Sequence, residues 1–246
     1  MVSIVRFLLW ILIIAIVIAG LITLLSPNMG GSTGVDASAR SRMLDEWFNS
    51  PADHADWSIQ PMQRCGTAPL QMPTSGYIGF LWDDSFRIGH RHSGLDIFGG
   101  GQPGDTPVYA AADGYLTRLP DWKSSIIIRI PADPLQPGRQ IWLYYAHMAD
   151  PDGVSFIVNQ FPPGTSEVPV LAGDLLGRQG NFSGTPGSPT GVHLHFSIVL
   201  DDGLGHFKNE LDIQNTLDPS PYLGLNLNAH SNNGEVPVCA SQPDGE

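Results

Sequence analysis

Histidine side chains and one aspartate recur in three separate parts of the chain. They are His90, His92, Asp96, His147, His193 and His195. Imidazole nitrogens and a carboxylate, without cysteine thiolates nearby, are ligands that suit Zn²⁺. Three such ligands leave one coordination position open, which is the arrangement of a catalytic zinc site. These residue types therefore predict a catalytic metal site.

The stretch IGHRHSGLDI, residues 88–97, holds two of the histidines and the aspartate. Its glycines disfavour a helix, so we expect a strand that runs into a loop. Alternate side chains of a strand share one face, which places His92 and Asp96 together and His90 beside them. The spacing alone leaves open which histidine binds an ion.

The stretch GVHLHFSIVL, residues 191–200, alternates strictly between apolar and polar side chains. A strand here turns Leu194 and Phe196 toward the core, and His193 and His195 toward the opposite face. Taken alone, such a pair is typical of a solvated strand face. Its occurrence with His147 and with the stretch 88–97 favours a shared site.

The composition predicts which elements position these side chains. The chain has 246 residues, with 28 Gly and 21 Pro and 42% hydrophobic residues, which is ample for one domain rich in loops. β-branched and aromatic runs predict strands at 124–130, 140–148 and 191–200, and Asp113-Gly114 predicts a hairpin turn. A short helix is expected within 37–48. Closely spaced strands indicate a mainly β fold, an antiparallel β-sandwich or barrel-like sheet.

The N-terminus carries a candidate membrane span. Phe7 to Leu25 is a run of 19 uncharged residues, which is long enough to cross a hydrocarbon core of about 30 Å. A cleaved signal peptide is the alternative, but its apolar region is usually shorter. We expect a membrane anchor at 1–25 and a linker or stalk at 26–60. Arg6 precedes the run, and no Lys or Arg follows it before Arg40, which favours an extracytoplasmic domain.

The net charge and the cysteine content exclude some binding partners and some kinds of metal site. A formal net charge of -12 leaves no basic surface for a phosphate backbone, so we expect no nucleic-acid partner. Cys65 and Cys239 form either one disulfide or two free thiols. With only two cysteines this far apart, a structural zinc site built on thiolates is not indicated.

Six segments appear in an order that carries a resemblance to a known family. They are HSGLDI, GDTPVYAAADGYL, YYAHM, LAGDLLGRQGN, GTPGSPTGVHLHFSI and LDPSPYL. In this order they resemble the M23 family of zinc endopeptidases, of the lysostaphin and LytM type. The resemblance runs from about Pro61 to Leu223, which implies a peptidase domain at 61–225 and a C-terminal tail at 226–246.

The resemblance implies a role for each motif residue. His92, Asp96 and His195 match the zinc ligands, and His147 and His193 match the catalytic histidines that face the substrate. Four histidines have no place in the pattern: His54, His90, His206 and His230. The family's tyrosine before the first ligand has no match here, since Phe86 stands in that neighbourhood and Tyr77 lies further upstream.

The implied function is hydrolysis of peptide bonds in peptidoglycan stems or cross-bridges, by an enzyme anchored in the bacterial plasma membrane through one N-terminal helix. A catalytically silent scaffold or regulator of other cell-wall hydrolases is the alternative. The residues leave open whether an activator protein takes part. The Gly-rich stretch 99–104 formally matches G-x-G-x-x-G, but it precedes a β-type run, so a dinucleotide site is not indicated.

Overall fold

The computed structural model describes residues 37–85 and 89–239. The predicted membrane anchor at 1–25 lies outside these ranges, as do Phe86 and the first part of the predicted linker. Within the described ranges, no helix is long and apolar enough to cross a membrane. The anchor and the domain boundaries therefore stay predictions.

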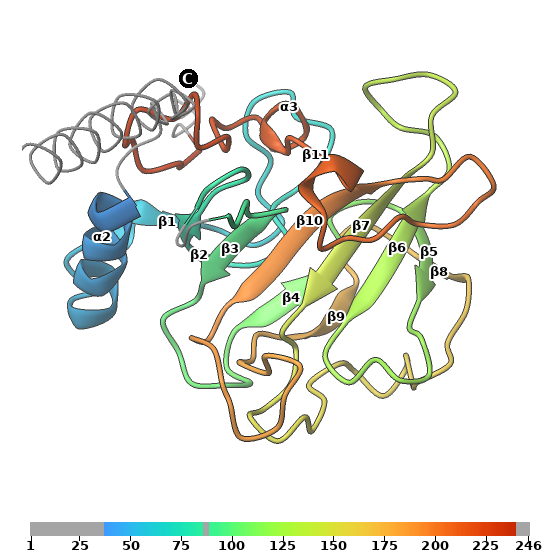
Figure 1. Ribbon diagram of the computed structural model, residues 1–246, viewed down its shortest axis with the longest axis horizontal. Helices are drawn as coiled ribbons and strands as arrows, with labels where there is room; N and C mark the ends of the chain where they lie inside the picture. The colour runs from blue at the N-terminus through green and yellow to red at the C-terminus, as the bar shows by residue number, and fades with distance from the viewer. Residues whose placement is uncertain (1–36, 86–88, 240–246) are drawn as a thin grey trace, which may run out of the picture. The chain divides into compact units, whose positions relative to one another are not determined.

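Antiparallel strands dominate the described chain, which confirms the expected mainly β class (Figure 1). The main sheet has the order β1-β2-β3-β10-β7-β6-β5-β8, with β11 paired to β10, and β4 and β9 form a second small sheet. The strands are β1 (Ser58–Ile59), β2 (Gly76–Phe80), β3 (Leu95–Phe98), β4 (Pro107–Tyr109), β5 (Gly114–Thr117), β6 (Ile126–Ile130), β7 (Ile141–Ala146), β8 (Val168–Val170), β9 (Leu175–Arg178), β10 (Leu194–Leu200) and β11 (Thr216–Leu217).

Few helices accompany the sheets in the described part of the chain. They are α2 (Ala37–Asn49), α3 (Ser220–Leu223) and the short 3₁₀ turns η1 (Ala55–Trp57) and η2 (Ile213–Asn215). The helix expected within 37–48 is thus present as α2, and it packs beside β2. The strands expected at 124–130, 140–148 and 191–200 correspond to β6, β7 and β10.

Strand β10 lies between β3 and β7 in the middle of the sheet. Its residues Leu194, Phe196 and Ile198 are fully buried in the main hydrophobic core, as the strict alternation predicts. On the other face of the sheet, His195 pairs with Asp96 of β3 and with Ala146 of β7. The register therefore brings the predicted metal ligands of two distant segments to adjacent strands.

The prediction of a hairpin at Asp113-Gly114 is wrong. β4 pairs with β9, whereas β5 pairs with β6 and β8, so the two apolar runs belong to different sheets. Val108 of β4 and Leu116 of β5 are both fully buried in the core that the two sheets share. Between them the Tyr145 hydroxyl accepts a hydrogen bond from the Ala111 amide at 2.9 Å. Tertiary packing overrides the local turn preference.

The two cysteines form a disulfide, which decides between the two alternatives left open by the sequence. Cys65 and Cys239 are 174 residues apart in the chain, and their Cα atoms lie 5.0 Å apart. The segment before Cys239 runs along the loop after β2, where the Trp82 amide donates to the Leu227 carbonyl at 3.0 Å. The disulfide thus ties the end of the described chain to the body of the domain.

Loss of this disulfide is expected to destabilise the domain. Closing a loop of 174 residues is worth roughly 5 kcal/mol at most in the chain-entropy model. We expect the double variant Cys65→Ser/Cys239→Ser to melt at a lower temperature than the oxidised protein, as followed by circular dichroism. Reduced wild-type protein serves as the control and should melt like the variant. Equal melting temperatures for the oxidised protein and the variant would contradict the prediction.

Candidate metal centre and catalytic cleft

His92, Asp96 and His195 converge on one point, as the resemblance to the peptidase family implies. His92 Nε2 and His195 Nδ1 lie 3.1 Å and 3.0 Å from the same carboxylate oxygen, Asp96 Oδ1, and the two nitrogens are 3.1 Å apart. All three residues are buried. Among the described residues, they form the group of potential ligands close enough to share one metal ion.

The size of this triangle suits a zinc ion. Tetrahedral zinc with bonds of about 2.0 to 2.2 Å places its ligand atoms roughly 3.3 to 3.6 Å apart. The three atoms of the site need to separate by only a few tenths of an ångström to meet that geometry. Two imidazole nitrogens and one carboxylate oxygen also form a set with an open fourth position. The residues present therefore fit zinc.

Protonation states support the same arrangement. The Leu81 carbonyl lies 2.9 Å from His92 Nδ1, and since a carbonyl only accepts, that nitrogen carries the proton and Nε2 keeps its lone pair. Burial lowers the pKa of His195. Burial opposes ionisation of Asp96, but the neighbouring His92 and His193 hold its pKa well below 3.8. Burial also disfavours the protonated form of His92, but the Asp96 carboxylate outweighs this effect and raises the pKa of His92. At low pH a metal ion must therefore displace a proton from His92 in order to bind.

His92 reaches the site from a loop, and Asp96 reaches it from β3. The expected order of a strand followed by a loop is therefore reversed, because the chain becomes extended only from Leu95 onward. The loop is fixed by two backbone bonds to the segment after β2: His92 donates to the Asp84 carbonyl, and Asp83 donates to the His92 carbonyl, each at 2.8 Å. Backbone pairing thus replaces regular strand structure around this ligand.

Side chains from both ends of the described chain contact the segment that contains Asp83 and Asp84. Asp83 accepts from Arg91 at 2.5 Å and lies 2.7 Å from His230 Nε2 of the C-terminal tail. Arg40 of α2 forms a buried ion pair with Asp84 at 3.0 Å. The position of His92 therefore depends on contacts with α2 and with the tail.

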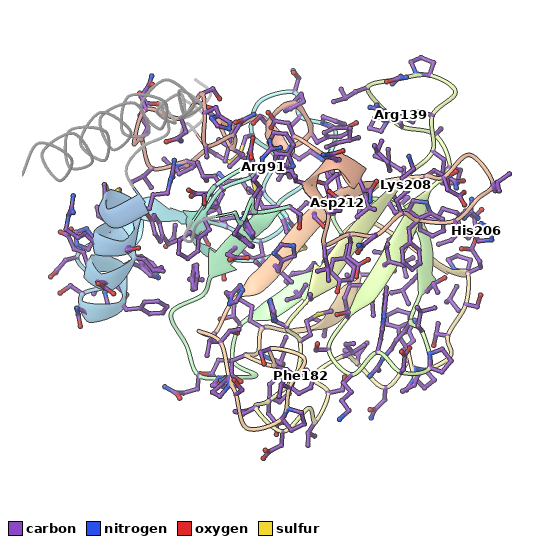
Figure 2. All side chains as sticks on the ribbon, viewed as in Figure 1. Arg91, Arg139, Phe182, His206, Lys208 and Asp212 are labelled. Carbon is purple, nitrogen blue, oxygen red and sulfur yellow. A yellow bond between two sulfur atoms is a disulfide. The ribbon has the colours of Figure 1, made fainter. Side chains whose placement is uncertain are left out.

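His147 and His193 lie next to the metal ligands, with their rings 4.5 Å apart. His147 Nδ1 lies 2.7 Å from the Phe182 carbonyl, and His193 Nδ1 lies 2.7 Å from the Gly191 carbonyl. Each Nδ1 therefore carries the proton, which leaves each Nε2 with a lone pair that can accept one. Figure 2 shows Phe182 among the loops at the end of the sheet where β7 finishes.

The backbone at His147 is in the left-handed region, with φ of 68°. A non-glycine residue adopts this conformation at a cost, and strained residues tend to cluster at functional sites. Burial, with the neighbouring His193, lowers the pKa of His147 to about 3. The ring is therefore neutral near pH 7, as a proton acceptor must be.

Gly94 makes room for the ligand from β10. A Cβ at this position would lie 2.4 Å from the Phe196 carbonyl oxygen and 2.9 Å from His195 Nε2. His195 Nε2 is itself buried, and it has no hydrogen-bond partner among the described residues. Because Gly94 has no side chain, His195 has the room it needs to direct Nδ1 toward the site.

The five residues line a cavity of about 620 Å³. Sequence reasoning missed several of its other lining residues, which are Leu44, Phe48, Phe80, Phe98, Thr190, Gly191 and Leu211. Leu44, Trp47 and Phe48 follow a helical i, i+3, i+4 spacing, which was a usable sign that α2 has a buried face. Nothing local in the sequence indicates what that face packs against.

The remaining candidates lie outside the ligand triangle. His90 lines the cavity, and its ring stacks on His92 at 6.4 Å. His54, His206 and His230 each lie beside a carboxylate, those of Glu46, Asp202 and Asp83. Tyr77 is buried next to Trp47 with its pKa raised by burial to about 12, and it is not among the cavity's lining residues.

No protein-family model and no curated protein matches the chain. Solved structures with a similar arrangement include Csd3 from Helicobacter pylori, at 20% identity over 63% of this chain and 34% of that one, with a TM-score of 0.38. Lysostaphin from Staphylococcus simulans matches at 20% identity over 69% of this chain and 56% of that one, with a TM-score of 0.39. A putative glycyl-glycine endopeptidase lytM from Ruminococcus gnavus matches at 27% identity over 59% and 49%, with a TM-score of 0.36.

Lysostaphin and LytM are also the types that the sequence motifs resemble. The matches span between about a third and just over half of the neighbours' chains.

Substitution of Gly94 is expected to disrupt the metal centre. In Gly94→Ala the new methyl group would overlap the Phe196 carbonyl and crowd His195, so we expect the affinity for zinc to fall at least about tenfold. Competition with a chelating dye measures this affinity. Gly191→Ala is the matched control, because its Cβ would meet nothing closer than 3.5 Å. Equal zinc affinity in the two variants would contradict the role assigned to Gly94.

The low pKa of His147 predicts how the stability of the metal-free domain depends on pH. Between pH 6.5 and about 3 the unfolded chain binds a proton at this ring and the folded chain does not, so the free energy of unfolding decreases as the pH falls. Above pH 6.5 both states are neutral there, and the contribution is constant.

We expect urea unfolding of the chelator-treated protein to show a larger loss of stability from about pH 7.5 to about pH 5 than the variant His147→Gln shows. The glutamine variant is the reference, because its side chain does not titrate. An identical pH dependence in both proteins would show that His147 is not held neutral by the fold.

Proposed function

We propose that this protein is a zinc-dependent endopeptidase that hydrolyses peptide bonds in peptidoglycan stems or cross-bridges. One observation carries the proposal: three ligand atoms lie 3.0 to 3.1 Å apart, and two further histidines beside them keep a lone pair on Nε2. Cation-binding surfaces do not require the two additional histidines. A hydrolase does, because water must lose a proton as it attacks a carbonyl.

The contacts within the site suggest a separate catalytic role for the metal ion, His193 and His147. When bound, zinc supplies a Lewis acid that lowers the pKa of water toward about 7 and polarises a carbonyl oxygen. His193 Nε2 lies 3.5 Å from Asp96 Oδ1, so it stands at the edge of the ligand triangle and is placed to accept the proton from the water. His193 can then return that proton to the leaving amine, and His147, whose Nε2 also carries a lone pair, is placed to orient the attacking water.

The backbone partners of the two rings serve this chemistry. The carbonyls of Phe182 and Gly191 hold each Nδ1–H, and this prevents the rings from turning the protonated nitrogen toward the substrate. A carbonyl cannot itself take the proton, so a proton that a ring accepts at Nε2 is not lost to its backbone partner. The proposal therefore needs no acidic side chain as the general base.

The alternative is a catalytically silent scaffold or regulator of other hydrolases. The complete set of three ligands and two further histidines supports catalysis, because a scaffold has no need to keep both tautomers fixed. The extracytoplasmic location and the single N-terminal anchor remain part of the proposal, and the uncharged run from Phe7 to Leu25 supports them.

Removing either catalytic histidine is expected to slow turnover and to leave the metal bound. We expect His193→Ala and His147→Ala to lower kcat by about 10²- to 10⁴-fold, the usual contribution of a general acid or base. Mass spectrometry of fragments released from purified peptidoglycan measures turnover, and elemental analysis measures zinc. His206→Ala is the control, because His206 is exposed, contacts Asp202 and does not line the cavity.

The variant His195→Ala tests the metal ligand, and an assay of the wild-type protein distinguishes an enzyme from a scaffold. The variant should neither bind zinc nor release fragments, and chelation should silence the wild-type protein in the same way. Cleavage by a zinc-free His195→Ala protein would contradict the assignment of the metal ligand. A zinc-loaded wild-type protein that releases no fragments from several wall types would instead support the scaffold.

A further inference from the structure

An apolar rim borders the cavity that holds the histidines, and no step of the proposed chemistry uses it. We define the apolar rim as Leu44 and Phe48 of α2, Phe80 and Phe98 of the sheet edge, and Leu211 of the loop after β10. These residues come from four separate parts of the chain: α2, the end of β2, the end of β3 and the loop after β10. Their convergence on one cavity therefore results from the tertiary fold.

Two members of the apolar rim remain exposed to solvent. Phe48 is 44% exposed and Leu211 is 74% exposed, although both line the cavity. Large apolar side chains gathered at the mouth of a cavity mark a binding surface, because exposing them to water has a free-energy cost. The surface is continuous with the metal centre, so its occupant is the molecule that reaches the metal.

The α2 side of the rim is held rigidly. Trp47 is buried against Tyr77 with ring centroids 5.9 Å apart, and Phe48 meets Phe98 edge to face at 5.5 Å. The Leu44 side chain packs over Gly79, where a Cβ would lie 3.1 Å from Leu44 Cδ1. The buried Arg40 pair with Asp84 anchors the start of the helix. Phe48 is thus exposed on a fixed support.

The opposite side is fixed by a different set of contacts. The Leu211 amide donates to Asn209 Oδ1 at 3.2 Å, and the next residue, Asp212, accepts from the Gln214 amide at 3.0 Å. Earlier in the same loop, Phe207 packs on Trp122 and Trp142 with ring centroids 5.7 and 5.6 Å apart. Figure 2 places Lys208 and Asp212 along this loop, in front of the sheet. The backbone that carries Leu211 is therefore held by turn hydrogen bonds.

We propose that the apolar rim is a specificity determinant that receives an aliphatic side chain of the peptide substrate next to the scissile bond. The inference rests on the proposed function and names its substrate class: peptides with an alanine or larger aliphatic residue at that position, in preference to oligoglycine. Glycine has no side chain to contact Phe48 or Leu211. A single methylene in an apolar pocket is commonly worth a tenfold or larger difference in kcat/KM.

The test compares two synthetic peptides, one of oligoglycine and one with aliphatic residues at the cleavage position, with the zinc-loaded full chain. Wild-type protein should favour the aliphatic peptide. Phe48→Ala and Leu211→Ala should each lower the ratio of the two kcat/KM values by about tenfold, mainly through KM. Leu204→Ala is the matched control, because Leu204 is 81% exposed on the same loop and does not line the cavity.

A second measurement does not depend on turnover. Calorimetry of the chelator-treated protein with the aliphatic peptide should give a negative heat-capacity change on binding, which is the signature of buried apolar surface. The change should become smaller in Phe48→Ala and stay the same in Leu204→Ala.

The outcomes separate the inference from the function on which it rests. Cleavage of oligoglycine at least as fast as the aliphatic peptide, or an unchanged ratio in both rim variants, would overturn the inference while the peptidase stands. If the wild-type protein cleaves neither peptide, the proposed function fails for these substrates, and the inference is then decided by the calorimetry: a heat-capacity change unaffected by Phe48→Ala overturns it.

Discussion

The antiparallel pairing of β3 with β10 is the constraint on which the site depends. It sets Asp96 directly opposite His195, so a carboxylate and an imidazole about a hundred residues apart meet across one ladder of hydrogen bonds. Side chains of a strand alternate between faces, so a shift of one residue in this register would turn one ligand into the core. The apolar face of the same strands, with Leu194, Phe196 and Ile97 fully buried, holds that register in place.

The third ligand is positioned by different means. His92 lies in a loop, and its place is set by backbone bonds to Asp83 and Asp84, which in turn contact the C-terminal tail and α2. The disulfide between Cys65 and Cys239 ties the tail to the domain. A rigid sheet therefore supplies two ligands, and a loop braced by distant parts of the chain supplies the third. The same helix α2 also walls the cavity, so support of the metal ligand and contact with substrate are linked.

Local pattern predicts part of this arrangement and tertiary packing determines the rest. The alternation at residues 192–198 predicts both the buried face of β10 and the shared face of His193 and His195, because period-two burial is a local property. The spacing of residues 88–97 could not distinguish His90 from His92, and the resemblance to a known family did. The failed hairpin at Asp113-Gly114 and the unforeseen contact of Leu211 with the cavity both depend on which sheet or loop a segment meets, which no local pattern encodes.

The central claim is that one zinc ion binds between His92, Asp96 and His195. Asp96→Asn keeps the size of the side chain and removes the charge that both histidines face, so it tests the claim with little change in packing. The most direct measurement is the zinc content of the purified full-length protein by elemental analysis, alongside circular dichroism to confirm folding. The account predicts one zinc ion per chain in the wild-type protein and almost none in folded Asp96→Asn. Stoichiometric zinc in Asp96→Asn, or its absence from wild-type protein supplied with zinc, would contradict it.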